Sequence, residues 1–410
     1  MALRWRMVLA FVLLLSPLWA RAQDFSQRGF GEATVRLYPQ TAPNDATRAV
    51  AEALFRYEPS WKARPWLRLS GSFDARADTH DRVASTVDWW DRGTKRPALS
   101  VRRLSATFSR SRLTVEVGKQ FVRWGKADVL NPTDRFAPRD YLDVVDNDWL
   151  GVTAARLTYG GETDTIDLVW APRVTPSRMP LFTERWTVAP AAVATLPVAD
   201  LGSVVPRGSQ AGARWNHLAS GYEYSLSFYQ GFNHLPLLDG RVTLVPPRLQ
   251  VVCVFPQMRM YGGDAAVPLK WLTVKGEAAY FTTTTPGADQ YALYVVQLER
   301  QSGEWFFVGG YAGEWVTRRR GAVQFSPERG LAHAFLGRAG YTIDTNRSLA
   351  FEGAVRRNGD GLWTKAEYSQ ASGQHWRTTV AFHLIRGGPD DFLGHYRRNS
   401  HLTATIRYSF

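Results

Sequence analysis

The sequence predicts an all-β fold: a transmembrane up-and-down antiparallel β-barrel of about 18 strands, with 16 as the alternative count. Three observations predict it, namely an export signal at the start, segments of alternating polarity, and alternating short and long connections between them. Composition agrees, because the chain is polar on average (mean hydropathy −0.27) yet contains 16 Trp, 16 Tyr and 21 Phe. A barrel in lipid needs an apolar, aromatic exterior and a polar interior on the same strands.

The first 22 residues have the organisation of a secretory signal peptide. Arg4 and Arg6 form a short basic region, residues 7–19 form an apolar run, and Ala20-Arg21-Ala22 supplies small residues for cleavage. A transmembrane anchor is the competing interpretation, but the apolar run is too short to span a bilayer. We therefore expect removal of residues 1–22 and a single mature domain, residues 23–410. No later window has eighteen consecutive apolar residues, which excludes a helical membrane protein.

Eighteen segments of the mature chain alternate between apolar and polar side chains and are separated by turn residues, the pattern of half-buried strands. Most have the nine to eleven residues that a tilted strand needs to cross the hydrocarbon layer. The predicted strands are 27–38, 48–58, 65–76, 98–109, 112–122, 151–159, 164–171, 209–217, 221–230, 257–267, 271–281, 290–300, 304–315, 333–343, 347–357, 362–370, 375–385 and 400–410.

The connections between these strands alternate in length. The short ones are 109–111, 160–162, 218–220, 301–303, 344–346 and 372–374. The others are mostly longer and include 77–97, 123–150, 172–208, 231–256, 316–332 and 386–399. A transmembrane barrel has short turns on one side and long loops on the other, and an even strand count places both termini on the short-turn side. A secreted sandwich or propeller is the alternative, but neither requires this alternation, and no repeated blade of about forty residues is present.

The final strand ends on an aromatic residue. In His401–Phe410 every second side chain is apolar, and the last two of these are Tyr408 and Phe410. This ending resembles the closing strand of Gram-negative outer-membrane β-barrels, which characteristically ends in Phe. The resemblance implies a bacterial outer-membrane location, with lipid and lipopolysaccharide around the protein. It also implies that Tyr408 and Phe410 form an assembly signal for the barrel assembly machinery.

The charge of the chain favours anionic partners but not nucleic acid. The net charge is +13, and without the signal's three arginines 47 basic residues remain against 37 acidic ones, or +10. A nucleic-acid binder would concentrate this charge, whereas here the only tight cluster is Arg318-Arg319-Arg320. We therefore expect lipopolysaccharide or acidic solutes as partners.

Residues 118–150 hold the densest combination of charged and turn-forming residues. Gly118-Lys119-Gln120, followed by Trp124-Gly125 and Asn131-Pro132, resembles a pattern of porin-like barrels of unassigned substrate. The functional interpretation is a constriction loop, 123–150, folded into a pore and selecting solutes by field and size. In this interpretation its basic residues face its acidic residues across the opening. The candidates are Arg123, Lys126, Asp134, Arg135, Arg139, Asp140, Asp143 and Asp146, with Asp148 beside them.

Two other interpretations of this segment stay open. One is a surface loop with solvated or locally paired charges. The other is a calcium site, which the absence of EF-hand spacing makes less favoured. The long loop 172–208, rich in proline, is interpreted either as a plug over the mouth or as an irregular loop at the rim. Basic residues on the strands are the lumen candidates: Arg156, Arg214, Arg338, Arg356, Arg377 and Arg407.

Catalytic motifs are missing from the sequence. There is no Gly-x-Ser-x-Gly elbow, His-Glu-x-x-His helix, phosphate loop or Cys/His zinc spacing, and the eight histidines are scattered. We therefore predict no enzyme, cofactor or metal, and a porin-like channel for passive diffusion of small polar or anionic solutes. The alternatives are a non-conducting outer-membrane scaffold or adhesin barrel and, less favoured, a barrel hydrolase.

Overall fold

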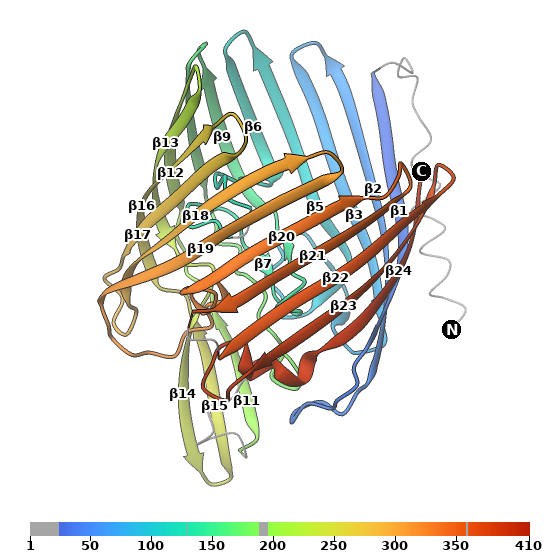
Figure 1. The fold of residues 1–410 in the computed structure, drawn as a ribbon. Helices are drawn as coiled ribbons and strands as arrows, with labels where there is room; N and C mark the ends of the chain where they lie inside the picture. Colours follow the sequence, from blue (N-terminus) through green and yellow to red (C-terminus); the bar gives the residue numbers. More distant parts are fainter. Residues whose placement is uncertain (1–23, 129, 188–195, 358–359) are drawn as a thin grey trace.

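The alternating segments pair with their sequence neighbours to form a closed barrel in a computed structural model that describes residues 24–128, 130–187, 196–357 and 360–410 (Figure 1). The predicted signal peptide lies outside the described residues. The first strand, β1 (Phe25–Leu37), closes the barrel by pairing antiparallel with the last, β24 (His401–Ser409), so that Thr34 lies opposite Thr405. The predicted all-β antiparallel barrel of eighteen strands is confirmed.

The eighteen barrel strands each overlap one predicted strand. The largest difference is at the second strand, which continues to Arg64 instead of ending at residue 58. The remaining strands in order around the barrel are β2 (Ala49–Arg64), β3 (Leu67–Asp78), β5 (Arg96–Arg110), β6 (Leu113–Gln120), β9 (Val152–Gly160), β10 (Asp164–Ala171), β12 (Gln210–Ala219), β13 (Tyr222–Phe232), β16 (Gln257–Pro268), β17 (Thr273–Thr282), β18 (Gln290–Ser302), β19 (Trp305–Arg318), β20 (Ala334–Thr342), β21 (Arg347–Arg356), β22 (Gly361–Ser372) and β23 (Trp376–Gly387).

Short hairpin turns join the strands at one end of the barrel, and the start of β1 and the end of β24 both lie at this end (Figure 1). Most connections at the other end are long and carry elements that the sequence did not predict. β11 (Val198–Val204), β15 (Pro247–Val254) and β14 (Leu237–Leu244) form a three-stranded sheet that projects beyond the barrel. The others are β4 (Val83–Asp88), β7 (Arg139–Asp140), β8 (Asp148–Trp149), helix α2 (Pro327–Gly330) and the 3-10 helix η2 (Gly394–Asn399).

The strands separate an apolar exterior from a polar interior. On β24 the side chains of Leu402, Ile406 and Tyr408 are exposed on the outside, whereas His401 and Thr403 are buried inside. The same alternation gives the other strands an exposed apolar outer surface, which suits contact with lipid hydrocarbon. Among the described residues no helix has the length and apolar character needed to cross a membrane.

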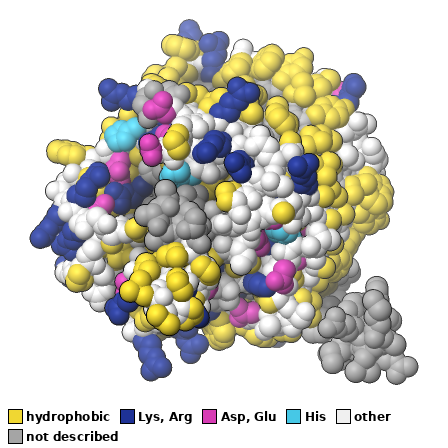
Figure 2. Space-filling model, turned by 90° about the horizontal axis from the view of Figure 1, so that it is seen from below, with side chains coloured by type: hydrophobic (Ala, Val, Ile, Leu, Met, Phe, Trp, Pro, Cys, Tyr) yellow, Lys and Arg dark blue, Asp and Glu magenta, His cyan; other side chains and the backbone are white. Residues whose placement is uncertain are grey.

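Long connections fill the end of the barrel opposite the short turns. Seen from that end, side chains of mixed type cover much of the face, with basic side chains scattered across it (Figure 2). Apolar clusters lie within the bore, and the largest combines inward strand residues with Val122, Trp124 and Phe136 from the segment between β6 and β9. The bore is therefore occupied by protein at this level rather than open across its whole width.

Candidate interior constriction

The segment between β6 and β9, residues 121–151, folds into the barrel. Trp124, Phe136, Tyr141 and Leu142 are at most 4% exposed, although they belong to a connection and not to a strand. Backbone inside a barrel needs hydrogen-bond partners from protein because little water reaches it. A carboxylate of β17 supplies such partners at one wall, and arginines of β1 and β5 bind carboxylates of the loop at the other.

Glu277, an inward residue of β17, holds the first half of the loop. Its Oε2 atom accepts hydrogen bonds from the backbone N–H groups of Lys126 (3.0 Å) and Ala127 (3.1 Å). Its Oε1 atom accepts from the backbone N–H and the hydroxyl of Thr133, both at 2.8 Å. The Glu277 residue is 3% exposed, so both oxygens of a buried carboxylate are satisfied by the loop.

Aromatic side chains seal the bore beside this contact. The Trp124 indole donates a hydrogen bond to Asp167 on β10 at 2.8 Å and meets Phe136 edge to face, with ring centroids 5.4 Å apart. Phe136 in turn meets Tyr229 of β13 edge to face at 5.0 Å. Offset and perpendicular rings of this kind are favourable beyond their buried area. This side of the bore is a packed core.

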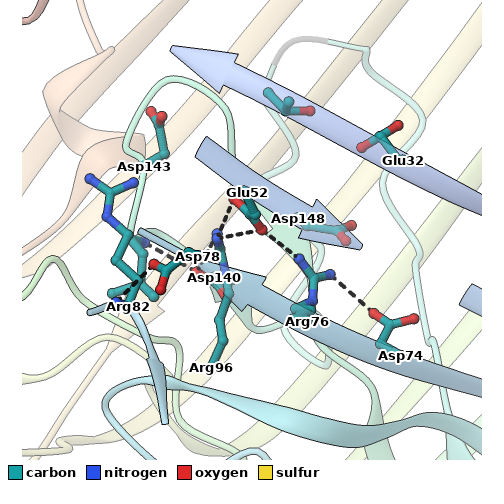
Figure 3. Close-up of polar contacts among 12 residues, drawn as sticks. Glu32, Glu52, Asp74, Arg76, Asp78, Arg82, Arg96, Asp140, Asp143 and Asp148 are labelled. Carbon is teal, nitrogen blue, oxygen red and sulfur yellow. Dashed lines mark hydrogen bonds and ion pairs between the residues drawn. The ribbon is translucent and has the colours of Figure 1, made fainter. Parts of the chain in front are cut away.

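Arginines on the opposite wall hold the second half of the loop. Asp140 accepts a hydrogen bond from Arg96 of β5 at 2.9 Å (Figure 3). It accepts another from Arg178, in the connection after β10, at 3.0 Å. Asp143 lies 3.5 Å from Arg36 of β1. Burial alone would raise the pKa of the Asp140 carboxyl, but Arg96 and Arg178 hold that pKa well below its usual range. The carboxylate therefore stays ionised and bound.

The prediction that the acidic residues of the loop face its own basic residues is wrong for all but one pair. Asp146 lies 3.3 Å from Arg36, and Asp148 accepts a hydrogen bond from Arg102 of β5 at 3.0 Å. Glu52 of β2 completes this network, because it bridges Arg96 at 3.1 Å and Arg76 of β3 at 3.0 Å (Figure 3). The inward arginines of β1 to β5 neutralise the loop's acids, since barrel closure places them closer than the loop's own cations.

The basic residues of the loop have other partners. Lys126 pairs with Glu223 of β13 at 2.7 Å, and Arg135 pairs with Glu328 of α2 at 2.9 Å. Arg139 donates to Asn147 at 2.8 Å and stacks over the Trp149 ring at 3.6 Å. Arg123 lies 3.7 Å from Asp134, the one predicted pair of opposite charge that forms within the loop.

The two anchoring walls lie on opposite sides of the barrel. Glu277 is on β17, whereas Arg36 and Arg96 are on β1 and β5, eight and seven positions from β17 in a ring of eighteen. The loop therefore crosses the full bore, fixed by hydrogen bonds at one wall and by ion pairs at the other. Such a crossing divides the bore into two parts at this level. One part is the aromatic core around Trp124, and the other borders β19 to β23.

A cavity of 360 Å³ remains between the loop and the wall formed by β19 to β23. Its lining extends from η2 and the segment before it, at the long-loop end, to Phe306, the second residue of β19 next to a short turn. It therefore runs along the strands past the level of the loop. The charged side chains in its lining are Asp128, Arg139, Asp146, Glu328, Arg338, Glu352 and Lys365.

The six lumen candidates point into the barrel, and most are paired. Five have carboxylate partners: Arg156 with Asp167, Arg214 with Asp264, Arg338 with Glu352, Arg356 with Asp391 and Arg407 with Glu32, at 2.5 to 3.5 Å. Arg377 donates to the Ser369 hydroxyl at 3.1 Å. The interior is therefore rich in charge but largely neutralised locally.

The residues of the proposed assembly signal close the barrel seam. Tyr408 points outward and packs against Trp376 with ring centroids 4.9 Å apart. The backbone of Phe410 exchanges two hydrogen bonds of 3.0 Å with Gly29, and its ring stacks on Phe55. No group of three or more His, Cys, Asp or Glu side chains suited to a metal ion occurs within the described ranges.

Sequence reasoning missed the strand residues that hold the loop, above all Glu277, Arg36 and Arg96. Each is a single charged residue on a strand of alternating polarity, which marks it as inward but gives no sign of its partner. The partner of Glu277 lies about 150 residues away in the chain. Only barrel closure brings the two together, so no local signal identifies this contact.

Comparison with known proteins adds to this picture. Neither the protein-family models nor the curated proteins contain a significant match to the sequence. Solved structures do match along almost the whole chain. A BenF-like porin from Pseudomonas fluorescens Pf-5 has a TM-score of 0.54 at 10% identity, covering 94% of this chain and 97% of its own. The fold is that of the outer-membrane porins.

Two further structures support this assignment of fold. Pseudomonas aeruginosa OccK3 (OpdO) has a TM-score of 0.55 at 9% identity over 95% of this chain and 96% of its own. OpdQ from the same organism has a TM-score of 0.53 at 10% identity, covering 94% and 98%. The predicted porin-like barrel is confirmed at the level of the fold, and at such low identity the similarity carries no assignment of solute.

Proposed function

We propose that this chain is a porin-like outer-membrane channel through which small polar solutes, including anions, diffuse passively. One observation carries the proposal. A loop fixed to opposite walls crosses the bore of a closed barrel and leaves a charged cavity of 360 Å³ along β19 to β23. A crossing loop of this kind sets the size and field of the remaining passage, which is how a pore selects solutes without using energy.

Residues 123–150 would be the constriction in this proposal. Arg139 and Asp146 of the loop line the cavity, whereas the other predicted residues hold the loop in place. The arginine pairs in the bore support weak rather than strong anion selectivity, because each paired carboxylate cancels most of the field of its partner. The proposed solutes are therefore small polar molecules, and they include anions.

A non-conducting scaffold is the second candidate, and one observation favours it. Apolar clusters in the bore include Leu130, Val144 and Trp186, and they border the cavity or the mouth above it. A bore packed in this way admits solutes only if the cavity is continuous with both mouths. The conductance of the barrel therefore decides between channel and scaffold.

Planar-bilayer recording of the purified mature protein tests the proposal. Stepwise current increments in potassium chloride support a channel. The absence of current at high protein concentration, with the barrel normally folded, supports a scaffold. Charge reversal of the loop cation that lines the cavity, by Arg139→Glu, should shift the reversal potential toward cation selectivity. Arg112→Glu, in a short turn, is the matched control. Equal reversal potentials in the two variants would remove the loop from the selection step.

The surroundings of the barrel belong to the same proposal. The exposed apolar exterior would contact lipid and, at the long-loop end, lipopolysaccharide. Tyr408 and Phe410 would be read by the barrel assembly machinery before the seam between β1 and β24 closes. Their position at that seam supports the idea, because recognition of the last strand would precede its pairing with the first.

A further inference from the structure

Two neighbouring rows of side chains form the wall of the cavity. Cross-strand pairing places Leu336, Ala354, Trp363 and Ile385 opposite one another on β20, β21, β22 and β23. All four line the cavity and are largely removed from solvent. This apolar row is continuous across four strands. A solute passing it meets hydrocarbon and an indole ring rather than charge.

The next inward row, two residues nearer the short turns, is charged. The same pairing aligns Arg338, Glu352, Lys365 and His383 across the same four strands. The rows are about 7 Å apart along the strands, since side chains on one face recur every second residue. Within the row the signs alternate, with Arg338 lying 3.5 Å from Glu352. The row therefore presents a positive, a negative and a positive group in sequence.

On the other side of the cavity, the loop also contributes apolar and charged side chains. Tyr141, Val144 and Val145 add apolar lining, and further apolar side chains come from the segments around α2 and η2. Asp146 of the loop is held by Arg36 of β1, which lies two strands beyond β23 around the barrel. Glu328 is likewise held by Arg135. The cavity therefore has an apolar section and a section of balanced charge, with little net field.

We propose that this cavity, if the chain is the channel proposed above, selects solutes with an apolar body and both charges but no net charge. The apolar body would lie against the row from Leu336 to Ile385 while the charged groups meet the row from Arg338 to Lys365. An anion without a cationic group would be attracted by Arg338 and Lys365 but repelled by Glu352 between them. A small zwitterion without an apolar body would gain nothing from the indole of Trp363.

Block of single-channel current by small solutes tests this inference. The probes are phenylalanine, glycine and phenylacetate, which separate the apolar body from the charges. We expect the concentration of phenylalanine that halves the single-channel current to be at least about tenfold lower than the concentration of glycine that does so. The reason is that burial of the phenylalanine ring removes apolar surface from water. Phenylacetate should be weaker than phenylalanine, because it lacks the cationic group that pairs with Glu352.

Variants assign the effect to the apolar row. Trp363→Ala should bring the half-blocking concentrations of phenylalanine and glycine to within about twofold of each other, since the indole that lines the cavity is lost. Tyr368→Ala is the matched control, because it removes an aromatic ring from the outer face of the same strand. Leu336→Ala on β20 is a second, milder variant that is informative if Trp363→Ala folds poorly.

The outcomes separate this inference from the proposed function. A barrel that conducts but shows equal block by phenylalanine and glycine overturns the inference and leaves the channel intact. Stronger block by phenylacetate than by phenylalanine also overturns it, because the site would then favour net negative charge. A barrel that conducts no ions overturns the proposed function, and the inference falls with it. Preferential block by phenylalanine that Trp363→Ala abolishes supports both.

Discussion

Replacement of Glu277 by glutamine should release one end of the loop that crosses the bore. Each carboxylate oxygen of Glu277 accepts two hydrogen bonds from the loop, two from Thr133 and two from the backbone of Lys126 and Ala127. The amide of Glu277→Gln keeps one acceptor oxygen and turns an N–H₂ group toward two buried donors. The amide loses two of the four bonds if its N–H₂ group faces Lys126 and Ala127. It loses one if that group faces Thr133, because the Thr133 hydroxyl can turn and accept a hydrogen bond from the amide.

The size of the effect follows from the chemistry of these bonds. A hydrogen bond to a charged group contributes about 1.5–3 kcal/mol, so loss of one bond costs roughly that much, and the remaining bonds weaken because their acceptor is no longer charged. Even the lower figure raises the population of the displaced loop about tenfold, at about 1.4 kcal/mol per factor of ten. The barrel itself should persist, because the ladders of β17 with β16 and β18 do not involve this side chain.

Two measurements on the Glu277→Gln protein check this reasoning. Limited trypsin digestion should cut at Lys126 or Arg135 in the variant and spare the wild type, in which this segment is largely buried. Single-channel recordings should show higher and noisier conductance. Glu116→Gln is the control, because Glu116 is an inward acid that pairs with Arg103 and not with the loop. Wild-type protease resistance together with wild-type conductance would refute the anchoring role.

Four further predictions concern the loop, its surroundings and the seam. Asp140→Ala should leave Arg96 buried without its strongest partner, at a local cost of about 3–5 kcal/mol, and should expose the loop to protease. Because the pKa of Asp140 is lowered, its stabilising contribution is present at neutral pH and lost only as pH falls below the ordinary carboxyl range, so conductance noise should rise in strongly acidic buffer. Burial lowers the pKa of His234 to about 4, so stability should increase from about pH 4 to 6.5, and His234→Asn should flatten that dependence in pH-resolved melting. Deletion of Phe410 should reduce the yield of heat-modifiable barrel in membranes several-fold, whereas the yield of exported unfolded chain should stay constant.

The barrel could be predicted because its signals are local. Alternation of side chains within about ten residues and the lengths of the connections are both visible in the chain, and each predicted strand corresponds to one barrel strand. The hairpin of β14 and β15 lies within residues 231–256, which were predicted as a long connection, and Pro246 and Pro247 lie between its strands and at the start of β15. A strand tolerates proline at its first residue.

The loop inside the bore could be predicted only as a location. Composition and turn residues singled out 123–150, and the structure places that segment inside the bore. Its contacts were not predictable, because Arg36, Arg96 and Glu277 are far away in the chain and reach the loop only after the barrel closes. The acids of the loop were therefore predicted to face the loop's own cations, whereas the fold pairs most of them with arginines of distant strands.

Buried ion pairs contribute more to the position of this loop than to the stability of the barrel. Desolvation of two charges offsets most of their attraction, so a pair such as Asp140 with Arg96 adds little net stability. A shifted loop, however, leaves both charges unpaired in the interior, and that costs several kcal/mol. The loop therefore keeps one position across the bore, because every other position would leave buried charges unpaired. A passage bounded by such a loop keeps a fixed width, which a passive channel needs because no energy source corrects its selectivity.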